Sequence, residues 1–363
     1  MILVYAEVIS ERLRYSCEVL LNILLKHDFE ITDDEKVFAA SSHFKINYSK
    51  KHFDNCIEIF PHQILFENNI HSIEPALIWK NEIAFIFSDD KSETGFDCFA
   101  ATFFLTSRYE EYQDYVADVH GRFPTQNSFS VRNNFHDQAS VHHYASELKR
   151  ILLNKFPEIK FAQSNFRFTL SYDIDIAFKY LARTSYQTVT GFVRSFLTGN
   201  WNEMVERWQV INKKKADPWN TFQLQTKWSK QYNLKCVYFF LIAKRKRFNR
   251  NLSTDQPLIQ QLIKGIAENF NCGVHPGYGS NLSELKSEIS NLKKLTKKNI
   301  EHSRQHFLKM TFPETYRNLI SAGIKTDWTM GYSNEIGFRC GIAEEFPWFD
   351  VRENKTTGLM LQP

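Results

Sequence analysis

Two carboxylates with one residue between them follow a strand-like run at residues 168–175 (FTLSYDID). Asp173 and Asp175 would share one face of an extended chain, and a turn at this point would let them converge on one metal ion or one water molecule. Aspartate also bonds backbone amides in turns, so capping of the next helix is the alternative. Taken alone, the pair slightly favours capping.

Two later segments also carry titratable side chains at the ends of strand-like runs. Residues 271–280 (NCGVHPGYGS) contain His275, and residues 303–307 (SRQHF) contain Arg304 and His306. A metal ion that acidifies a bound water, with a carboxylate that accepts the proton of that water, can hydrolyse an amide. A lone His in a Gly-Pro turn is usually structural, and a lone Arg usually pairs with a surface acid.

In this order, with YFFL at 238–241 between the first two, the segments resemble the polysaccharide deacetylases of the NodB-homology group (carbohydrate esterase family 4). The runs LSYDID, GVHPGY and SRQHFLKM are similar to a Bacteroidetes-type branch that carries an extra N-terminal domain. The resemblance is strong over the second half of the chain. It implies Asp173 as the catalytic base, Asp175 and His275 as metal ligands, and a groove walled by Arg304. Four such residues in the family's order make a pocket the better interpretation.

The resemblance also implies a cofactor and a substrate. The cofactor would be a divalent metal ion, with zinc expected and cobalt or nickel as alternatives. The substrate would be an N-acetylated sugar in a cell-surface polysaccharide or its precursor. The competing hypothesis is a catalytically impaired carbohydrate-binding or assembly protein that keeps the deacetylase fold.

The chain departs from the family pattern at two places. The second His of the metal motif should fall at position 279, where Gly279 stands. His306 could replace that ligand, or Tyr278 or Ser280 could hold a water that fills its place. The family's C-terminal His, which protonates the leaving group, has no match before Pro363. We therefore expect that the chain is truncated or that this branch has lost the acid.

The length of 363 residues predicts two domains. Over residues 1–160 the pattern of apolar runs predicts a smaller α+β domain of unknown role. It contains a hairpin at 76–87 and a helix at 96–112. Strand and helix patterns alternate over residues 161–363, and strands are expected at 324–328 and 336–339. This alternation matches the distorted, incomplete (β/α) barrel of the deacetylases, with the site at the C-terminal strand ends.

The segment at about 178–216 combines helix-spaced aromatic residues with cations. Phe196, Trp201 and Trp208 alternate with arginines, a pattern that also occurs on membrane surfaces. Gly191 and Gly199 interrupt any long amphipathic stripe. We therefore favour a helical insertion over the barrel mouth, and membrane-surface contact stays the alternative.

Composition narrows the class of protein further. The formal net charge is only +4, and no nucleic-acid-binding motif accompanies the basic clusters. The six cysteines are widely spaced and lie among apolar residues, which predicts buried free thiols. The start has no basic region of a signal peptide, and no apolar run approaches the ~18 residues of a spanning helix. These features predict a cytoplasmic protein that does not bind nucleic acid.

Overall fold

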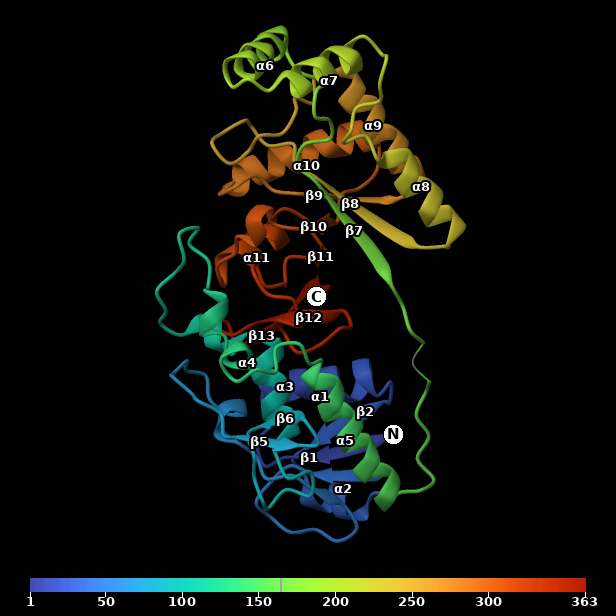
Figure 1. The fold of residues 1–363 in the computed structure, drawn as a ribbon. Coiled ribbons are helices and arrows are strands. Elements are labelled where there is room, and N and C mark those ends of the chain that lie inside the picture. The colour runs from blue at the N-terminus through green and yellow to red at the C-terminus, as the bar shows by residue number, and fades with distance from the viewer. Residues whose placement is uncertain (164) are drawn as a thin grey trace. The chain divides into compact units, whose positions relative to one another are not determined.

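The computed structural model describes residues 1–163 and 165–363, and the chain divides into two compact units (Figure 1). Unit 1 comprises Met1–Asn165, Leu308–Ile320 and Lys325–Pro363, and unit 2 comprises Phe166–Phe307 and Ser321–Ile324. The expected second domain over 161–363 therefore differs from the structure in its C-terminal part, which belongs to unit 1.

Unit 1 begins with a four-stranded sheet in which every pairing is parallel. Its strands follow the order β2 (Phe29–Thr32), β1 (Ile2–Tyr5), β3 (Phe44–Asn47) and β4 (Ile57–Glu58). The helices of this region are α1 (Glu11–Cys17), which continues as a π-helical segment at Glu18–Leu24, α2 (Glu35–Ala40), and a short 3₁₀ turn at Gln63–Leu65. Parallel strands need crossover connections, which here carry α1 between β1 and β2 and α2 between β2 and β3.

The middle of unit 1 contains the expected hairpin, formed by β5 (Leu77–Lys80) and β6 (Ile83–Ile86). The helix expected at 96–112 is shorter than predicted. It runs as α3 (Cys98–Thr106), and Arg108 adopts a left-handed conformation (φ 54°) before a 3₁₀ turn at Tyr109–Tyr112. Further helical segments follow at Thr125–Asn127, α4 (Phe129–Arg132) and α5 (Ser140–Lys155).

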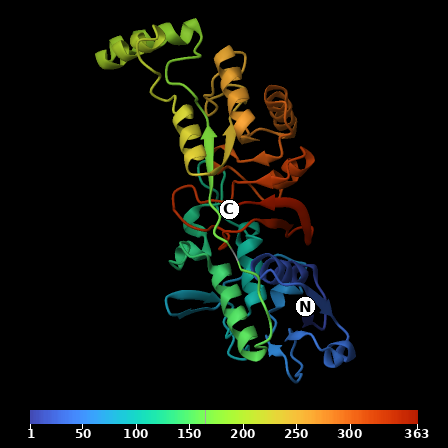
Figure 2. The ribbon, with the colours of Figure 1, turned by 90° about the vertical axis from the view of Figure 1, so that its right-hand side faces the viewer.

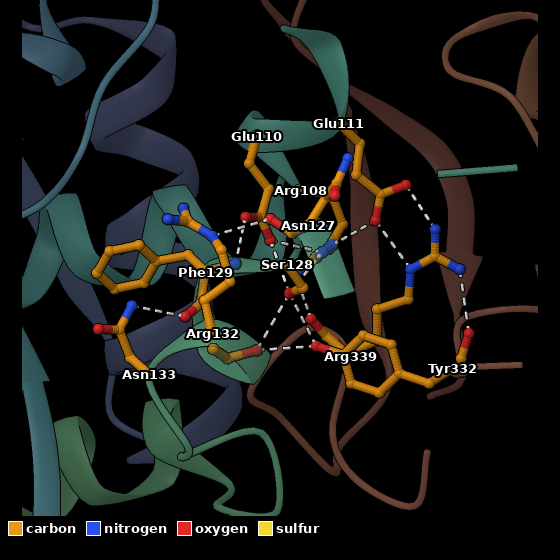
Figure 3. A network of polar contacts seen from close by, with 12 residues as sticks. Arg108, Glu110, Glu111, Asn127, Ser128, Phe129, Arg132, Asn133, Tyr332 and Arg339 are labelled. Carbon is orange, nitrogen blue, oxygen red and sulfur yellow. Dashed lines mark hydrogen bonds and ion pairs between the residues drawn. The ribbon is translucent and has the colours of Figure 1, made fainter. Parts of the chain in front are cut away.

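A buried ion-pair network explains why the C-terminal segment belongs to unit 1 (Figure 3). Arg108 Nε lies 2.7 Å from Glu111 Oε1, and Arg339 Nη2 lies 2.5 Å from Glu111 Oε2. Arg108 also contacts the Arg339 carbonyl and pairs with Glu110 at 2.7 Å. A carboxylate held by two arginines from distant parts of the chain ties these parts together, since an unpaired buried charge is costly.

The C-terminal segment of unit 1 adds α11 (Glu314–Ser321), β11 (Thr326–Asp327), β12 (Phe346–Asp350) and β13 (Lys355–Leu361). β13 pairs parallel with β11 and antiparallel with β12. The strand expected at 336–339 is wrong: Ile336 is 94% exposed, and the Phe338 amide donates to the His136 carbonyl (2.7 Å). This segment packs against another loop instead of joining a sheet.

Unit 2 is a parallel α/β arrangement in which the strand order is β10-β9-β8-β7. The strands are β7 (Thr169–Ile174), β8 (Lys235–Phe240), β9 (Asn271–Val274) and β10 (His302–Ser303). The helices are α6 (Ser185–Leu197), α7 (Trp201–Ile211), α8 (Phe222–Gln231), α9 (Pro257–Asn269) and α10 (Leu282–Thr296). The predicted capping box at the start of α10 is confirmed: Asn281 accepts from the Glu284 amide, and Glu284 accepts from the Asn281 amide.

Two expectations about composition can be checked against the structure. All six cysteines are buried free thiols, as predicted. In the described part of the chain, every helix is too short or too polar to span a bilayer.

Candidate metal centre

The strand register of unit 2 brings three candidate residues into one row. The register aligns the last residues of the four parallel strands, which are Ile174, Phe240, Val274 and Ser303. The residues that follow directly on β7, β9 and β10 are Asp175, His275 and Arg304. These side chains therefore start from one edge of the sheet, where the carboxyl ends of its strands lie.

Three potential ligand atoms converge beyond this edge. His275 Nε2 lies 3.3 Å from Asp175 Oδ1, and His306 Nδ1 lies 3.4 Å from the same oxygen. The two imidazole nitrogens are 3.0 Å apart. Both histidines are buried, whereas the Asp175 side chain is 46% exposed. The cluster is therefore anchored in the protein and open to solvent on its Asp175 side.

Hydrogen bonds to the backbone determine which nitrogen of each imidazole carries the proton. His275 Nδ1 lies 2.6 Å from the Arg304 carbonyl, and His306 Nε2 lies 3.1 Å from the Phe248 carbonyl. Because a carbonyl oxygen only accepts, each of these nitrogens must donate. A neutral imidazole then has its lone pair on the other nitrogen, so both lone pairs face the cluster. The same arrangement orients metal-binding histidines in proteins.

The electrostatics of the cluster favour a cation. Asp175 Oδ1 is buried and accepts no hydrogen bond within the described residues. Burial alone would raise the pKa of Asp175, but the neighbouring His275 and His306 lower it. Burial lowers the pKa of His306 against the opposing effect of Asp175. A charged oxygen and two lone pairs at these distances repel one another unless a proton or a metal ion lies among them.

The separations also agree with the geometry of a divalent transition metal. Zinc binds histidine nitrogen and carboxylate oxygen at about 2.0–2.2 Å, so tetrahedral ligands lie about 3.3–3.6 Å apart. The two histidine–aspartate separations, 3.3 and 3.4 Å, fall in this range, and the two imidazole nitrogens are closer, at 3.0 Å. Catalytic zinc sites have three protein ligands and one open position. Asp175, His275 and His306 fit such a site, and they are grouped within 4.8 Å.

Asp173 lies beside the cluster and outside the group of three ligand residues. It shares a face of β7 with Ser171, two residues earlier. Arg304 bridges both side chains: Nη1 lies 3.2 Å from Asp173 Oδ1, and Nη2 donates to Ser171 Oγ at 2.8 Å. The Arg304 guanidinium lies 4.9 Å from the centre of the Phe239 ring. Asp173 is thus a positioned carboxylate beside a cation.

Gly273 makes room for the ring on which Arg304 lies. A Cβ atom at Gly273 would lie 2.6 Å from the Phe239 ring and 2.7 Å from the His302 carbonyl. Phe239 is fully buried and pairs with Asp173 in the strand register. Any larger residue at position 273 would therefore displace this ring or the backbone of β10.

The turn after β9 is held by hydrogen bonds to α10. Ser280 Oγ donates to Glu288 of α10 (2.8 Å), which also accepts from the Gly277 amide (3.1 Å). Gly279 has a left-handed backbone (φ 67°), which favours glycine. Ser280 therefore braces the turn, and His306 stands where the cluster needs its third ligand.

Tyr278 takes part in an aromatic group beside the cluster. Its ring centre lies 4.5 Å from that of Phe248 and 5.5 Å from that of Phe307. Phe307 follows His306 directly and has a left-handed backbone (φ 61°). The structure thus places Asp175, His275 and His306 together, and Tyr278 packs against Phe307, the neighbour of His306.

Sequence reasoning did not find two residues that support the site. Phe248 contributes a carbonyl oxygen, which no side-chain pattern can reveal. Glu288 is an acid on a helix that already has a capping Glu284, so it resembles an ordinary solvated residue. Its pKa is raised by burial, against the hydrogen bonds from Ser280 and the Gly277 amide.

Comparisons with known proteins give limited matches. Residues 2–157 match a family of unknown function, DUF7033. No curated protein matches the chain. A crystal structure reported as a "putative polysaccharide deacetylase" from Mycobacterium smegmatis matches with a TM-score of 0.31 and 11% identity. The match covers 53% of this chain and 56% of that one.

Proposed function

We propose that unit 2 is a metal-dependent hydrolase that removes the acetyl group from an N-acetylated sugar of a cell-surface polysaccharide or its precursor. The observation that carries this proposal is the convergence of two lone-pair nitrogens and one buried carboxylate oxygen at metal-ligand separations. The sequence resemblance supplies the substrate class. The proposal includes the distorted barrel expected for this class.

Asp175, His275 and His306 would hold the metal ion, with zinc favoured by the mixed nitrogen and oxygen ligands. When bound, such an ion acidifies a water molecule and polarises a carbonyl. Cobalt and nickel accept the same ligands.

Asp173 would accept the proton of the attacking water. Arg304 pairs with this carboxylate, and Ser171 accepts a hydrogen bond from the same guanidinium, so the carboxylate is held in one orientation. A positioned base contributes typically about 10²–10⁴-fold to the rate. The carbonyl of Arg304 fixes His275 at the same time, so one residue positions both the base and a ligand.

Acetate release from N-acetylated oligosaccharides, with Zn²⁺, Co²⁺ or Ni²⁺ supplied, tests this function. We expect Asp173→Asn to lower the rate by about 10²–10⁴-fold and to leave the metal content unchanged. Asp255→Asn, an exposed carboxylate outside the cluster, is the matched control and should keep full activity. If the metal-loaded protein releases no acetate above the Asp173→Asn background, hydrolysis is refuted. Retained glycan binding would then indicate a carbohydrate-binding protein.

A further inference from the structure

Helices α6 and α7 form a hairpin in unit 2. Figures 1 and 2 show them side by side, beyond the helices that flank the strands. Each helix has its own N-cap: Thr184 accepts from the Gln187 amide, and Asn200 accepts from the Glu203 amide. Gly199 turns the chain between them with a left-handed backbone (φ 64°). The hairpin is therefore a well-formed element with defined ends.

One face of this hairpin is apolar and exposed. The large apolar side chains on this face recur at helical spacing, and nearly all of them keep about half or more of their surface in solvent. They are Tyr186, Val189, Val193, Phe196 and Leu197 on α6, and Trp201, Val205, Trp208 and Ile211 on α7. Phe196 and Trp201 meet edge to face, with ring centres 5.4 Å apart, so the two helices share one patch. An exposed apolar patch that extends over two helices indicates an interaction surface.

A strongly basic cavity lies on another side of the same hairpin. Its volume is about 930 Å³, and α6, α7 and the loop after β8 all contribute to its lining. The cations that line it are Lys179, Arg183, Arg194, Arg207, Arg245 and Arg250, against the single acid Glu203. Within the described residues, Arg183, Arg194, Arg245 and Arg250 have no carboxylate at ion-pair distance.

Three further observations indicate unbalanced positive charge. Arg207 is buried, pairs with Glu203 at 3.0 Å, and leaves its Nε without a hydrogen bond among the described groups. Burial, together with the charges of Arg245 and Arg207, lowers the pKa of Arg183. Over residues 183–216 the chain has six cations and two acids. A covering partner should therefore be anionic as well as apolar.

We propose that the α6–α7 hairpin docks on the surface of a lipid bilayer that contains anionic phospholipids. Its apolar face enters the region between headgroups and acyl chains, as interfacial amphipathic helices do. Trp201 and Trp208 suit this depth, since tryptophan prefers membrane interfaces. The cations of the hairpin and its cavity attract the lipid phosphates. This docking is independent of the proposed hydrolysis and of the metal centre.

Co-sedimentation of the full chain with vesicles tests the proposal. We expect binding to phosphatidylcholine vesicles that contain phosphatidylglycerol, at least tenfold weaker binding to pure phosphatidylcholine, and loss of binding at high salt. The double variant Phe196→Ser/Leu197→Ser should lower binding at least tenfold. Its control is Val119→Ser/Ile336→Ser, two apolar residues outside the hairpin that are more exposed, at 94% each.

A second pair of variants tests the role of charge. Arg194→Gln/Arg245→Gln should weaken binding by roughly fivefold per removed cation, whereas Lys293→Gln/Lys294→Gln on α10 should leave it unchanged. Circular dichroism of each variant establishes that it is folded.

Three results would overturn the proposal. These are absence of binding to anionic vesicles, equal binding to neutral vesicles, and full binding by the Phe196→Ser/Leu197→Ser variant. A concentration-dependent dimer in light scattering that this variant abolishes would show instead that a second copy of the chain covers the face.

Discussion

Replacing His306 with alanine distinguishes a metal site with three protein ligands from a site with only Asp175 and His275 as ligands. Loss of a group that only orients a ligand typically costs about 10–100-fold in metal affinity. His306 faces the cluster with its own lone pair, so its loss should cost at least about 100-fold, or about 2.8 kcal/mol. Truncation also removes the hydrogen bond that His306 Nε2 donates to the Phe248 carbonyl.

A competition titration with a chromophoric zinc chelator measures this change. The control is His142→Ala in unit 1, a histidine that accepts a hydrogen bond from the Ala343 amide (3.1 Å) and should leave zinc affinity unchanged. At zinc concentrations of 100 times the Kd, binding stabilises the wild type by about 2.7 kcal/mol. For a domain of roughly 150–250 residues this raises the Tm by about 5–11 °C. If His306→Ala binds zinc within threefold of the wild type, the assignment of His306 as a ligand is refuted.

Two further predictions concern the stability of the protein. Gly273→Ala should destabilise the protein by about 1–3 kcal/mol through overpacking against Phe239 and the His302 carbonyl, and an unchanged Tm would contradict this. Glu111→Ala should cost about 3–5 kcal/mol, because it removes the carboxylate that pairs with the buried Arg339 and one of the two acids that pair with Arg108. Burial alone would raise the pKa of Glu111, but its arginine partners lower it. The stabilisation by Glu111 is therefore present above the pKa of this group in the unfolded chain and is lost as pH falls through its pKa in the folded protein. The free energies of unfolding of Glu111→Gln and wild type, measured by urea titration, should therefore converge in acid.

Local patterns predicted most of the elements around the site. The alternation in residues 168–175 marks β7, the continuous apolar run after Lys235 marks β8, and the polar–apolar spacing after Asn281 marks α10. These elements depend on short-range periodicity, which a sequence displays directly. The strand expected at 336–339 failed because its backbone partner is His136, about two hundred residues earlier.

The candidate site was only partly predictable for a similar reason. Asp175 and His275 follow strands whose ends can be located from the sequence. The role of His306 depends on the chain path at Phe307, where the left-handed backbone breaks any recognisable pattern. The tautomers depend on the carbonyls of Phe248 and Arg304, which carry no sequence signal. The position of the C-terminal segment was not predictable either, because it depends on ion pairs between residues far apart in the sequence.

Anomalous diffraction from crystals grown with zinc tests the central claim most directly. Data collected on both sides of the zinc edge should show one peak about 2.0–2.2 Å from Asp175 Oδ1, His275 Nε2 and His306 Nδ1. The same crystals of His275→Ala should lack this peak. A wild-type map without a peak among these three atoms, or with zinc bound elsewhere in unit 2, would contradict the assignment of this cluster as a metal centre.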